Sequence, residues 1–439
     1  MYSHVNQQDA IQKKYIDILR KKKSKLFYGM NMQNILWNET FFCQKKYNIL
    51  KMSVRTFVLS PKIDANIENN DLLCIYTKNY RTDHDQYWER IKEDSGRHDD
   101  ITILSRDNFI DFFSVIKKII WFFTFYKEFG KIIPRREKVY LSLQLVLRKY
   151  TLEKVKKYKL LPKIAMCFFD SSPDENVLMQ YFRQIGAITV TNQHGQALFQ
   201  SWEYDLVNQS QILNFKCDYY LAKGDMQIAQ FEKAGFNKKQ FLKLGIVGSN
   251  KSGYKKHDFK CFAVFLDCPS LPFADISNYK LIDMAKKIAH TMNMRYIVKT
   301  HPTELEGKYE MCVDGNCIEV CNKNIKLEEV FEKIDFGIIH ASATYVDLYL
   351  YGLRCFRLKS EIAYPISIKE DEFENVDTIC SLLQEWNNKE FSEQGSYINS
   401  VRKLYDDGWY QGKVFDILQS ILKNKEKENK NENSSFNSN

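Results

Sequence analysis

The sequence has 439 residues and a formal net charge of +9, and hydrophobic residues make up 44% of it. This length favours two or three domains over one, and this composition is typical of a globular protein with sizeable cores. The 11 cysteines include no CxxC pair, and neither a signal-peptide core nor a bilayer-spanning apolar run is present, so we expect a cytoplasmic protein with reduced thiols.

The first part of the chain predicts a peripheral segment and the start of a parallel sheet. Residues 1–24 are polar and lysine-rich with a partial apolar stripe, which indicates a basic leader, either a surface helix or loose chain. Apolar runs predict strands at 26–28, 57–59, 72–76 and 101–104, and a charged stretch predicts a helix at 83–94. Short apolar strands with intervening helices fit a parallel sheet.

The stretch from Asp107 to Gly130 is rich in aromatic residues and is followed by a second basic helix. Between Arg106 and Lys163 the sequence contains 15 Lys and Arg residues but only 5 Asp and Glu residues. One interpretation is two long helices with apolar faces in the core and lysines in solvent. The other is a surface from Phe109 to Lys159 that meets anionic lipid or a polyanionic acceptor. Nucleic acid is not expected, because no binding motif accompanies the charge.

A βαβ pattern then leads to a histidine. Residues 163–169 and 187–191 predict strands, and residues 173–185 predict the helix between them, with Pro173 in its first turn. Gln193-His194-Gly195 follows the second strand. His194 therefore stands at a carboxyl end, where open α/β sheets bind ligands, and Gly195 lets a ligand or backbone come close.

The same architecture recurs in the second half of the chain. The first half ends with strands at 218–222 and 241–248, a helix at 225–234 and a small, basic linker at 249–256. The second half predicts strands at 261–266, 295–299, 318–321, 336–339 and 355–358 and helices at 278–292, 327–334, 345–353, 376–387 and 396–422. From Lys423 onward the chain has almost no apolar residues, so we expect disorder.

Two strand ends in the second half carry residues suited to phosphate. The strand at 295–299 runs into Thr300-His301-Pro302-Thr303-Glu304. After the strand at 336–339, Ser342 and Thr344 stand at the start of a helix, whose unpaired N–H groups and partial positive charge favour a phosphate. An ordinary helix N-cap is the alternative explanation of these hydroxyl residues.

Taken together, these motifs resemble the GT-B glycosyltransferases. More narrowly, they resemble the bacterial surface-polysaccharide branch, which includes capsule and lipopolysaccharide transferases and the CDP-glycerol glycerophosphotransferases of teichoic acid synthesis. The resemblance covers about Lys163 to Leu422 and rests on Gln193-His194-Gly195, Ala222 to Gly248, Lys299-Thr300-His301-Pro302 and Asp335 to Gly352. It implies an α/β GT-B fold, in which two Rossmann-like domains with parallel sheets face a central cleft.

The implied domain organisation follows the chain. It comprises a basic leader (1–24), an N-terminal acceptor domain (25–248), a linker (249–256), a C-terminal nucleotide-donor domain (257–395), a helix that returns to the N-terminal domain (396–422) and a disordered tail (423–439).

The sequence departs from the family pattern at two points. Gln196 and Ala197 stand where the glycerophosphotransferases carry Thr and Pro after His-Gly, which weakens an assignment to glycerol phosphate. Related bacterial sialyltransferases carry an acidic-acidic-Gly motif before their His-Pro motif. The corresponding triplet here, Asp406-Asp407-Gly408, lies after it, so we interpret it as the turn that opens the last helix.

The resemblance and the residue chemistry together suggest roles on a donor side. Candidates to bind the donor are Lys299, His301, Thr303, Glu304, Ser342, Thr344 and Asp347. We expect His301 and the two hydroxyls to stabilise the departing nucleotide, and Asp347 to bind a ribose hydroxyl or orient His301.

On the acceptor side, His194 is the candidate base for an acceptor hydroxyl near neutral pH, with Gln193 and Gly195 beside it. We expect no metal and no cofactor, because protein groups can neutralise the leaving phosphate. The spacing of Cys312, Cys317 and Cys321 also lacks a fourth zinc ligand.

The predicted function is transfer of a sugar or polyol phosphate from a nucleotide-activated donor to a polysaccharide or lipid-linked acceptor of the cell envelope. The expected location is the cytoplasm, with peripheral attachment to an anionic inner membrane face as one option. Two alternatives stay open: a sugar-nucleotide 2-epimerase of the same fold, and a non-catalytic member that binds nucleotide or glycan in an envelope assembly.

Overall fold

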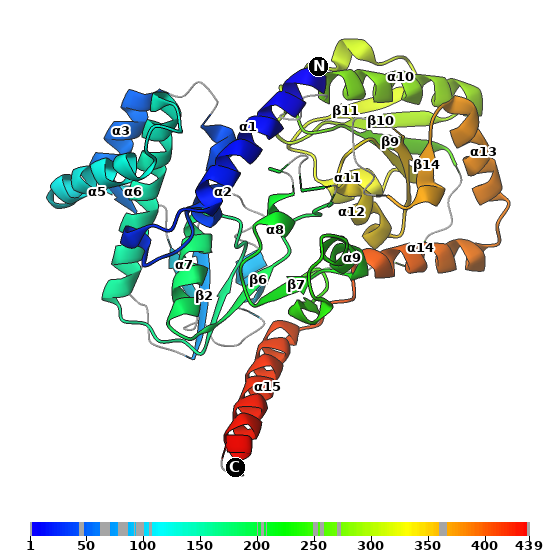
Figure 1. Ribbon diagram of the computed structural model, residues 1–439. Helices are drawn as coiled ribbons and strands as arrows, with labels where there is room; N and C mark the ends of the chain where they lie inside the picture. Colours follow the sequence, from blue (N-terminus) through cyan, green and yellow to red (C-terminus); the bar gives the residue numbers. More distant parts are fainter. Residues whose placement is uncertain are drawn as a thin grey trace. The chain divides into compact units, whose positions relative to one another are not determined.

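The computed structural model describes residues 2–43, 48–61, 71–77, 87–91, 93, 101–104, 108–199, 201–202, 206–207, 209–248, 253–254, 259–269, 274–359 and 367–436. The chain divides into two units (Figure 1). Unit 1 comprises Met1–Gly248 and Trp409–Asn439, and unit 2 comprises Ser249–Gly408. Each unit is built on one six-stranded parallel sheet.

The sheet of unit 1 has the strand order β3-β2-β5-β6-β7-β8. Its strands are β2 (Leu72–Thr77), β3 (Ile101–Leu104), β5 (Ile164–Cys167), β6 (Ile188–Asn192), β7 (Tyr219–Ala222) and β8 (Phe241–Lys243). Strands β1 (Leu59–Pro61) and β4 (Asn108–Ile110) form a separate antiparallel pair. Every residue of β5 and β6 is buried, as expected for a parallel sheet that is covered on both faces.

Unit 1 also contains helices. They are α1 (Tyr2–Arg20), α2 (Met32–Phe42), α3 (Ile49–Val58), α5 (Val115–Glu128), α6 (Arg135–Lys157), α7 (Pro173–Gln184), α8 (Ser210–Leu213), α9 (Asp225–Lys233) and α15 (Lys413–Phe436). Short 3-10 turns are η1 (Lys25–Phe27), η2 (Phe112–Ser114) and η3 (Lys238–Gln240). Helix α7 begins with Pro173, Asp174 and Glu175, which suit the free N–H groups and positive end of a helix.

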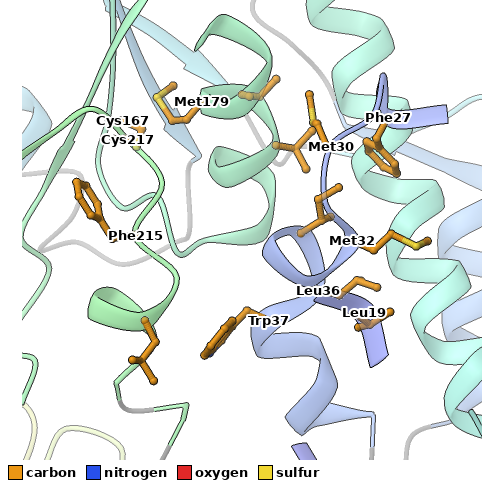
Figure 2. Close-up of a cluster of buried hydrophobic side chains, with 14 of the residues drawn as sticks. Leu19, Phe27, Met30, Met32, Leu36, Trp37, Cys167, Met179, Phe215 and Cys217 are labelled. Carbon is orange, nitrogen blue, oxygen red and sulfur yellow. The ribbon is translucent and has the colours of Figure 1, made fainter. Parts of the chain in front are cut away.

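The N-terminal segment belongs to the core of unit 1. Tyr15, Ile16 and Leu19 of α1 are buried in the same cluster as the apolar residues of α2. Figure 2 shows Leu19, Met32, Leu36 and Trp37 of this cluster. The partial stripe recognised in the sequence is therefore a buried helix face. Interpreting residues 1–24 as a peripheral leader underestimated it, because most residues of α1 are polar and the basic run at residues 20–23 stands at its end.

Two strands expected in the first half differ from the structure. Residues 25–27 form η1, and Tyr28 and Gly29 continue into a left-handed turn with φ values of 52° and 81°. Of the strand expected at 57–59, residues 57 and 58 complete α3, and Leu59 is in a strand as the first residue of β1. Both runs are short and apolar, and such runs occur in buried helices as well as in strands. The helix expected at 83–94 lies mostly outside the described residues.

The basic, aromatic stretch forms two helices, as one of the two interpretations predicted. Trp121 and Phe125 of α5 are buried. Three cations expected in solvent are also buried: Lys118, Arg148 and Lys149. Lys118 donates hydrogen bonds of 2.8 Å to the carbonyl of Leu59 and the hydroxyl of Ser60, and burial lowers its pKa to about 8.

The sheet of unit 2 has the order β11-β10-β9-β12-β13-β14. Its strands are β9 (Cys261–Phe265), β10 (Arg295–Lys299), β11 (Cys317–Cys321), β12 (Phe336–Ile339), β13 (Arg354–Leu358) and β14 (Glu372–Phe373). Its helices are α10 (Ala274–Met292), α11 (Leu327–Phe331), α12 (Thr344–Tyr351), α13 (Val376–Asn387) and α14 (Phe391–Tyr405), with 3-10 turns η4 (Glu310–Cys312) and η5 (Lys369–Asp371). Counted from β9, this is the 3-2-1-4-5-6 order of a doubly wound Rossmann sheet.

The helix expected at 396–422 is interrupted. Helix α14 ends at Tyr405, and α15 begins at Lys413 after Gly408 and Gly412, whose φ values are 88° and 89°. Helix α15 continues to Phe436, where we had expected a disordered tail from Lys423. The polar sequence after Lys423 contains no Pro or Gly before Phe436. A helix whose first turns are packed against unit 1 can therefore continue through it.

No helix in the described part of the chain is both long and apolar enough to cross a membrane.

Candidate functional site

The predicted site residues fall into two groups, one in each unit, and each group lies at the carboxyl ends of parallel strands. In unit 2 the relevant strands are β10, β9 and β12, which are neighbours in the centre of the sheet. Chain connections leave β9 for β10 on one side and reach β12 on the other. This reversal is the topological switch point at which open α/β sheets bind ligands.

A buried Asp–His pair joins the ends of β9 and β12. Asp267 follows β9 and His340 follows β12, and His340 Nδ1 lies 2.6 Å from the Asp267 carboxylate. The same carboxylate accepts hydrogen bonds from the Ala341 N–H at 2.8 Å and the Ser277 hydroxyl at 2.7 Å. A carboxylate only accepts, so Nδ1 is the donor and the imidazole is fixed in one orientation.

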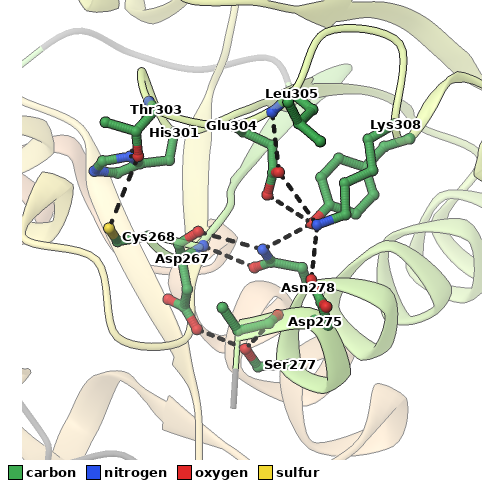
Figure 3. Close-up of polar contacts among 12 residues, drawn as sticks. Asp267, Cys268, Asp275, Ser277, Asn278, His301, Thr303, Glu304, Leu305 and Lys308 are labelled. Atoms are coloured by element: carbon green, nitrogen blue, oxygen red, sulfur yellow. Dashed lines mark hydrogen bonds and ion pairs between the residues drawn. The ribbon is translucent and has the colours of Figure 1, made fainter. Parts of the chain in front are cut away.

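The turn after β10 presents His301. Its Nδ1 accepts the Thr303 N–H at 3.2 Å and lies 2.8 Å from the Thr303 hydroxyl. In a neutral ring this arrangement leaves the proton on Nε2, which can donate to a phosphate oxygen. The Thr303 hydroxyl also lies 4.0 Å from the thiol of Cys268, the residue after Asp267 (Figure 3). The loop after β9 therefore touches both neighbouring strand ends.

Glu304 stabilises the turn after β10 that contains His301. Its side chain is only 3% exposed, and its carboxylate accepts hydrogen bonds from Lys308 at 3.1 Å and from the Tyr309 hydroxyl at 3.0 Å. Asn278 of α10 donates to the same hydroxyl at 3.1 Å and accepts the Asp267 N–H at 2.7 Å (Figure 3). A continuous polar network thus runs from Glu304 to Asp267 and holds the two loops together.

Lys299, another predicted donor-side residue, forms a hydrogen bond with a backbone carbonyl. It is buried at the end of β10, and its ammonium donates to the carbonyl of Asn322 after β11. Burial lowers the pKa of Lys299. In the structure this side chain ties two adjacent strand ends together.

Ser342 and Thr344 form the expected turn into α12. The Ser342 hydroxyl donates to the Thr344 hydroxyl at 3.0 Å and accepts the Thr344 N–H at 3.3 Å. Both side chains are half-buried, and Asp347 is exposed on the first turn of the helix. Gly352 closes α12 in the left-handed conformation, with φ of 89°. Hydroxyls and the positive end of a helix thus stand beside the Asp267–His340 pair.

A buried carboxylate anchors α12 from its other side. Asp371 accepts hydrogen bonds from the hydroxyls of Tyr345 at 2.5 Å, of Tyr349 and of Tyr397 at 2.7 Å, and from the Arg354 guanidinium at 3.1 Å. Burial raises the pKa of Tyr345 and Tyr349 well above the usual value. These phenols therefore stay protonated and act as donors, which fixes the helix whose N-terminus carries Thr344.

In unit 1, His194 lies in the loop after β6. Its ring contacts those of Phe168 and Phe169 after β5, with centroids 5.3 and 5.2 Å away. Gln193 is buried, and its amide donates to the Gly195 carbonyl at 2.7 Å and accepts the Lys223 N–H at 2.7 Å. Gly195 has φ of 69°, a conformation that favours glycine.

Glutamine side chains hold this loop by its backbone. Gln211 accepts the His194 N–H and donates to the His194 carbonyl. Gln227 of α9 forms the same two-bond pair with Ala197, at 2.9 and 3.0 Å. The imidazole of His194 is thus carried on a backbone fixed at several points, as a positioned base requires.

Sequence reasoning missed Asp267 and His340. The signal was present, because each residue directly follows a predicted strand, the rule that selected His301 and Ser342. Asp371 had no such signal: the four side chains that it binds come from α12, β13 and α14.

Comparison with known proteins identifies the fold. No protein-family model matches the sequence, and no curated protein sequence matches it. The solved UDP-GlcNAc 2-epimerase from Methanocaldococcus jannaschii superposes with a TM-score of 0.50 and 10% identity, over 80% of this chain and 99% of that chain. The structure of MnaA from S. aureus with UDP superposes with a TM-score of 0.51 and 9% identity, over 81% of this chain and 97% of that chain. The chain has the GT-B fold, with two Rossmann-like units, as its motifs predicted.

Proposed function

We propose that the chain is an enzyme that binds a nucleotide-activated donor at the carboxyl ends of β9, β10 and β12 and releases the nucleotide. The supporting observation is the contact chain that joins His301 and Thr303, Cys268 and Asp267, and the turn from His340 to Thr344. It gathers an imidazole, hydroxyls and a helix N-terminus, which are the groups that stabilise a leaving phosphate.

The first candidate reaction is transfer to a hydroxyl of a cell-envelope glycan, of capsule, lipopolysaccharide or teichoic-acid type. A transferase needs a base for the acceptor, and His194 on its glutamine-held loop suits that role. The motifs that resemble those of the surface-polysaccharide transferases, Gln193-His194-Gly195 and Lys299-Thr300-His301-Pro302, contain both histidines. A lipid-linked acceptor would place the enzyme at the inner face of the cell membrane.

The second candidate is a sugar-nucleotide 2-epimerase. The likeness in fold to the M. jannaschii UDP-GlcNAc 2-epimerase favours it. Both reactions use the same nucleotide site, and they differ in whether an acceptor is needed. An epimerase must remove and return the hydrogen on C2 of the sugar, whereas a transferase must deprotonate an acceptor hydroxyl.

One experiment separates these outcomes. The purified chain is incubated with UDP-, CDP- and CMP-linked donors, with and without acceptor oligosaccharides, and free nucleotide and the sugar product are followed by NMR. We expect nucleotide release that depends on an acceptor, and its loss in His301→Ala but not in the exposed neighbour variant Leu305→Ala. A C2 epimer formed without an acceptor identifies the second candidate. If no donor binds or reacts, the proposed function is wrong.

A further inference from the structure

Helix α5 has two apolar faces, and only one of them is buried. Trp121 and Phe125 point into the core of unit 1. A second set of large apolar side chains is exposed, and we call it the α5 apolar face: Phe112, Phe113, Ile116, Ile120 and Phe123. The positions 116, 120 and 123 recur at helical spacing, so they lie along one stripe that continues from η2.

This exposure is unusual in extent. Phe113 is fully exposed, and Phe112 and Ile116 are exposed by 70% and 74%. A single exposed apolar residue needs no explanation, but contiguous apolar patches on soluble proteins mark binding sites. Helix α3, which packs beside α5, also carries two exposed apolar side chains one helical turn apart, Leu50 and Val54.

Positive charge accompanies the apolar face. No acidic residue occurs between Phe112 and Lys127. Lys117 is exposed on α5 itself, and Lys127, Lys131, Arg135 and Arg136 are exposed at the turn into α6. A second copy of this chain would bring these cations against like charges, and a water-soluble polyanionic glycan would not cover phenylalanine and isoleucine. Apolar side chains with a cationic rim match an anionic lipid surface.

The basic residues of α6 are a different feature. Lys154 and Lys156 lie over the rings of Tyr150 and Tyr28, at 5.2 and 3.8 Å from their centroids. Lys149 is buried and paired with Glu153 at 2.7 Å. These three cations take part in the packing of unit 1, whereas Lys157 and Lys159 are exposed. The exposed apolar side chains that a bilayer would take up lie on η2 and α5, so we place the surface there and not along the whole stretch to Lys159.

We propose that the α5 apolar face inserts into the headgroup region of an anionic phospholipid bilayer and attaches the protein peripherally. The side chains would enter the boundary between headgroups and acyl chains, roughly 5–10 Å deep. This inference rests on exposure and charge and is independent of the proposed nucleotide chemistry.

Vesicle flotation tests the proposal with the full chain. Vesicles of phosphatidylcholine alone are compared with vesicles that also contain phosphatidylglycerol, at low and high salt. We expect binding to the anionic vesicles that weakens with salt, because the Debye length falls from roughly 10 Å at 0.1 M to about 3 Å at 1 M. In the triple variant Phe113→Ser, Ile116→Ser and Ile120→Ser, binding should fall by far more than roughly tenfold, since the insertion of one such side chain alone contributes about that factor.

Matched controls separate insertion from general stickiness. The control triple Ile276→Ser, Leu305→Ser and Met311→Ser changes exposed apolar side chains of unit 2 and should bind like the parent. Lys117→Glu with Lys127→Glu should weaken binding, whereas Lys238→Glu with Lys239→Glu should not. In Phe113→Trp, the indole emission should shift to the blue on anionic vesicles.

Three results overturn the proposal. The first is a parent protein that does not bind anionic vesicles at low salt, and the second is a triple variant that binds as well as the parent. The third is self-association of the parent, measured by light scattering, that the triple variant abolishes while vesicles bind neither protein. That result would assign the α5 apolar face to a second copy.

Discussion

His340 Nδ1 and the carboxylate of Asp267 lie 2.6 Å apart, although 73 residues separate them, and both side chains are almost completely buried. The contact joins the loops on the two sides of the switch point in unit 2. Because Asp267 also accepts the Ala341 N–H, it fixes the backbone that leads into Ser342. One buried carboxylate therefore sets the geometry of the proposed phosphate turn.

Replacement of Asp267 tests this relationship. Asp267→Ala leaves the His340 ring, the Ala341 N–H and the Ser277 hydroxyl without their acceptor, so we expect a loss of roughly 3–5 kcal/mol in the free energy of unfolding. Nucleotide affinity should fall as well. Urea unfolding and calorimetric titration with UDP and CMP measure the two effects. Ser277→Ala, which removes one donor and keeps the carboxylate, should cost only about 1 kcal/mol.

His301→Ala should abolish turnover and weaken nucleotide binding. The Nε2–H of the ring is the expected donor to the phosphate, and a hydrogen bond to a charged group contributes roughly 1.5–3 kcal/mol. Stability should change little, because the ring is only half-buried. Undiminished nucleotide affinity in this variant would remove His301 from the donor site.

The hydroxyls before α12 give a graded prediction. Ser342→Ala and Thr344→Val should each reduce nucleotide affinity by at least roughly tenfold, since each removes a hydroxyl that can donate a hydrogen bond to the charged phosphate. The Thr344 N–H and the helix end persist in both variants, so binding should be weakened without being lost. Ser381→Ala on α13, whose hydroxyl donates to the Asp377 carbonyl, is the matched control. If these hydroxyls only cap the helix, the two variants should lose stability while their nucleotide affinity stays unchanged.

Asp371→Asn should be among the most destabilising single changes in unit 2. It leaves the buried Arg354 guanidinium without its carboxylate and weakens acceptance from three tyrosine hydroxyls, at a cost of roughly 3–5 kcal/mol. Tyr397→Phe removes one donor and should cost about 1 kcal/mol. Chemical denaturation of both variants measures the difference. Similar stabilities would mean that Asp371 does not anchor α12.

Asp170 predicts a pH dependence in unit 1. Burial raises its pKa from 3.8 to about 6, an effect that hydrogen bonds from the N–H groups of Lys216 and Cys217 partly offset. The folded state therefore keeps this proton after the unfolded chain has lost it. The corresponding stability is complete below pH 3.8 and is lost as the pH rises through about 6.

Asp170→Asn cannot ionise and tests that dependence. The stability of the parent relative to the variant should fall by about 3 kcal/mol between these two pH values, at about 1.4 kcal/mol per pKa unit. Urea unfolding of both proteins across this range provides the measurement. A constant difference would show that Asp170 ionises normally in the folded protein.

Much of the fold follows from local sequence. Parallel strands such as β5, β9 and β12 are short apolar runs, and a polar residue (Asp170, Asp267 or His340) follows each within three positions. The GT-B fold predicted from the order of the motifs is confirmed. Errors arose where an apolar run belonged to another element, as at residues 26–28, or where polar residues outnumbered the apolar ones in a helix with a buried face, as in α1. In these cases tertiary packing decided the structure.

The site was less predictable than the fold. His301, Ser342 and Thr344 stand where the strand-end rule placed them, and their roles stay predictions. Asp371 and the buried state of Lys299 depend on side chains that come together only after the sheet has formed. A local pattern does not contain such contacts, because their partners are distant in the sequence.

The path of the chain has a consequence for synthesis. Unit 2 is one continuous stretch, Ser249–Gly408, whereas unit 1 receives α15 only after unit 2 is complete. Val414, Leu418 and Ile421 of α15 fill the core beside β5 and β6. During synthesis on the ribosome, unit 1 is therefore begun first but completed last. Until α15 is made, the apolar residues that it covers in unit 1 stay exposed. In a circular permutant that starts at Ser249, with the two original termini joined, unit 1 would be one continuous stretch of the sequence.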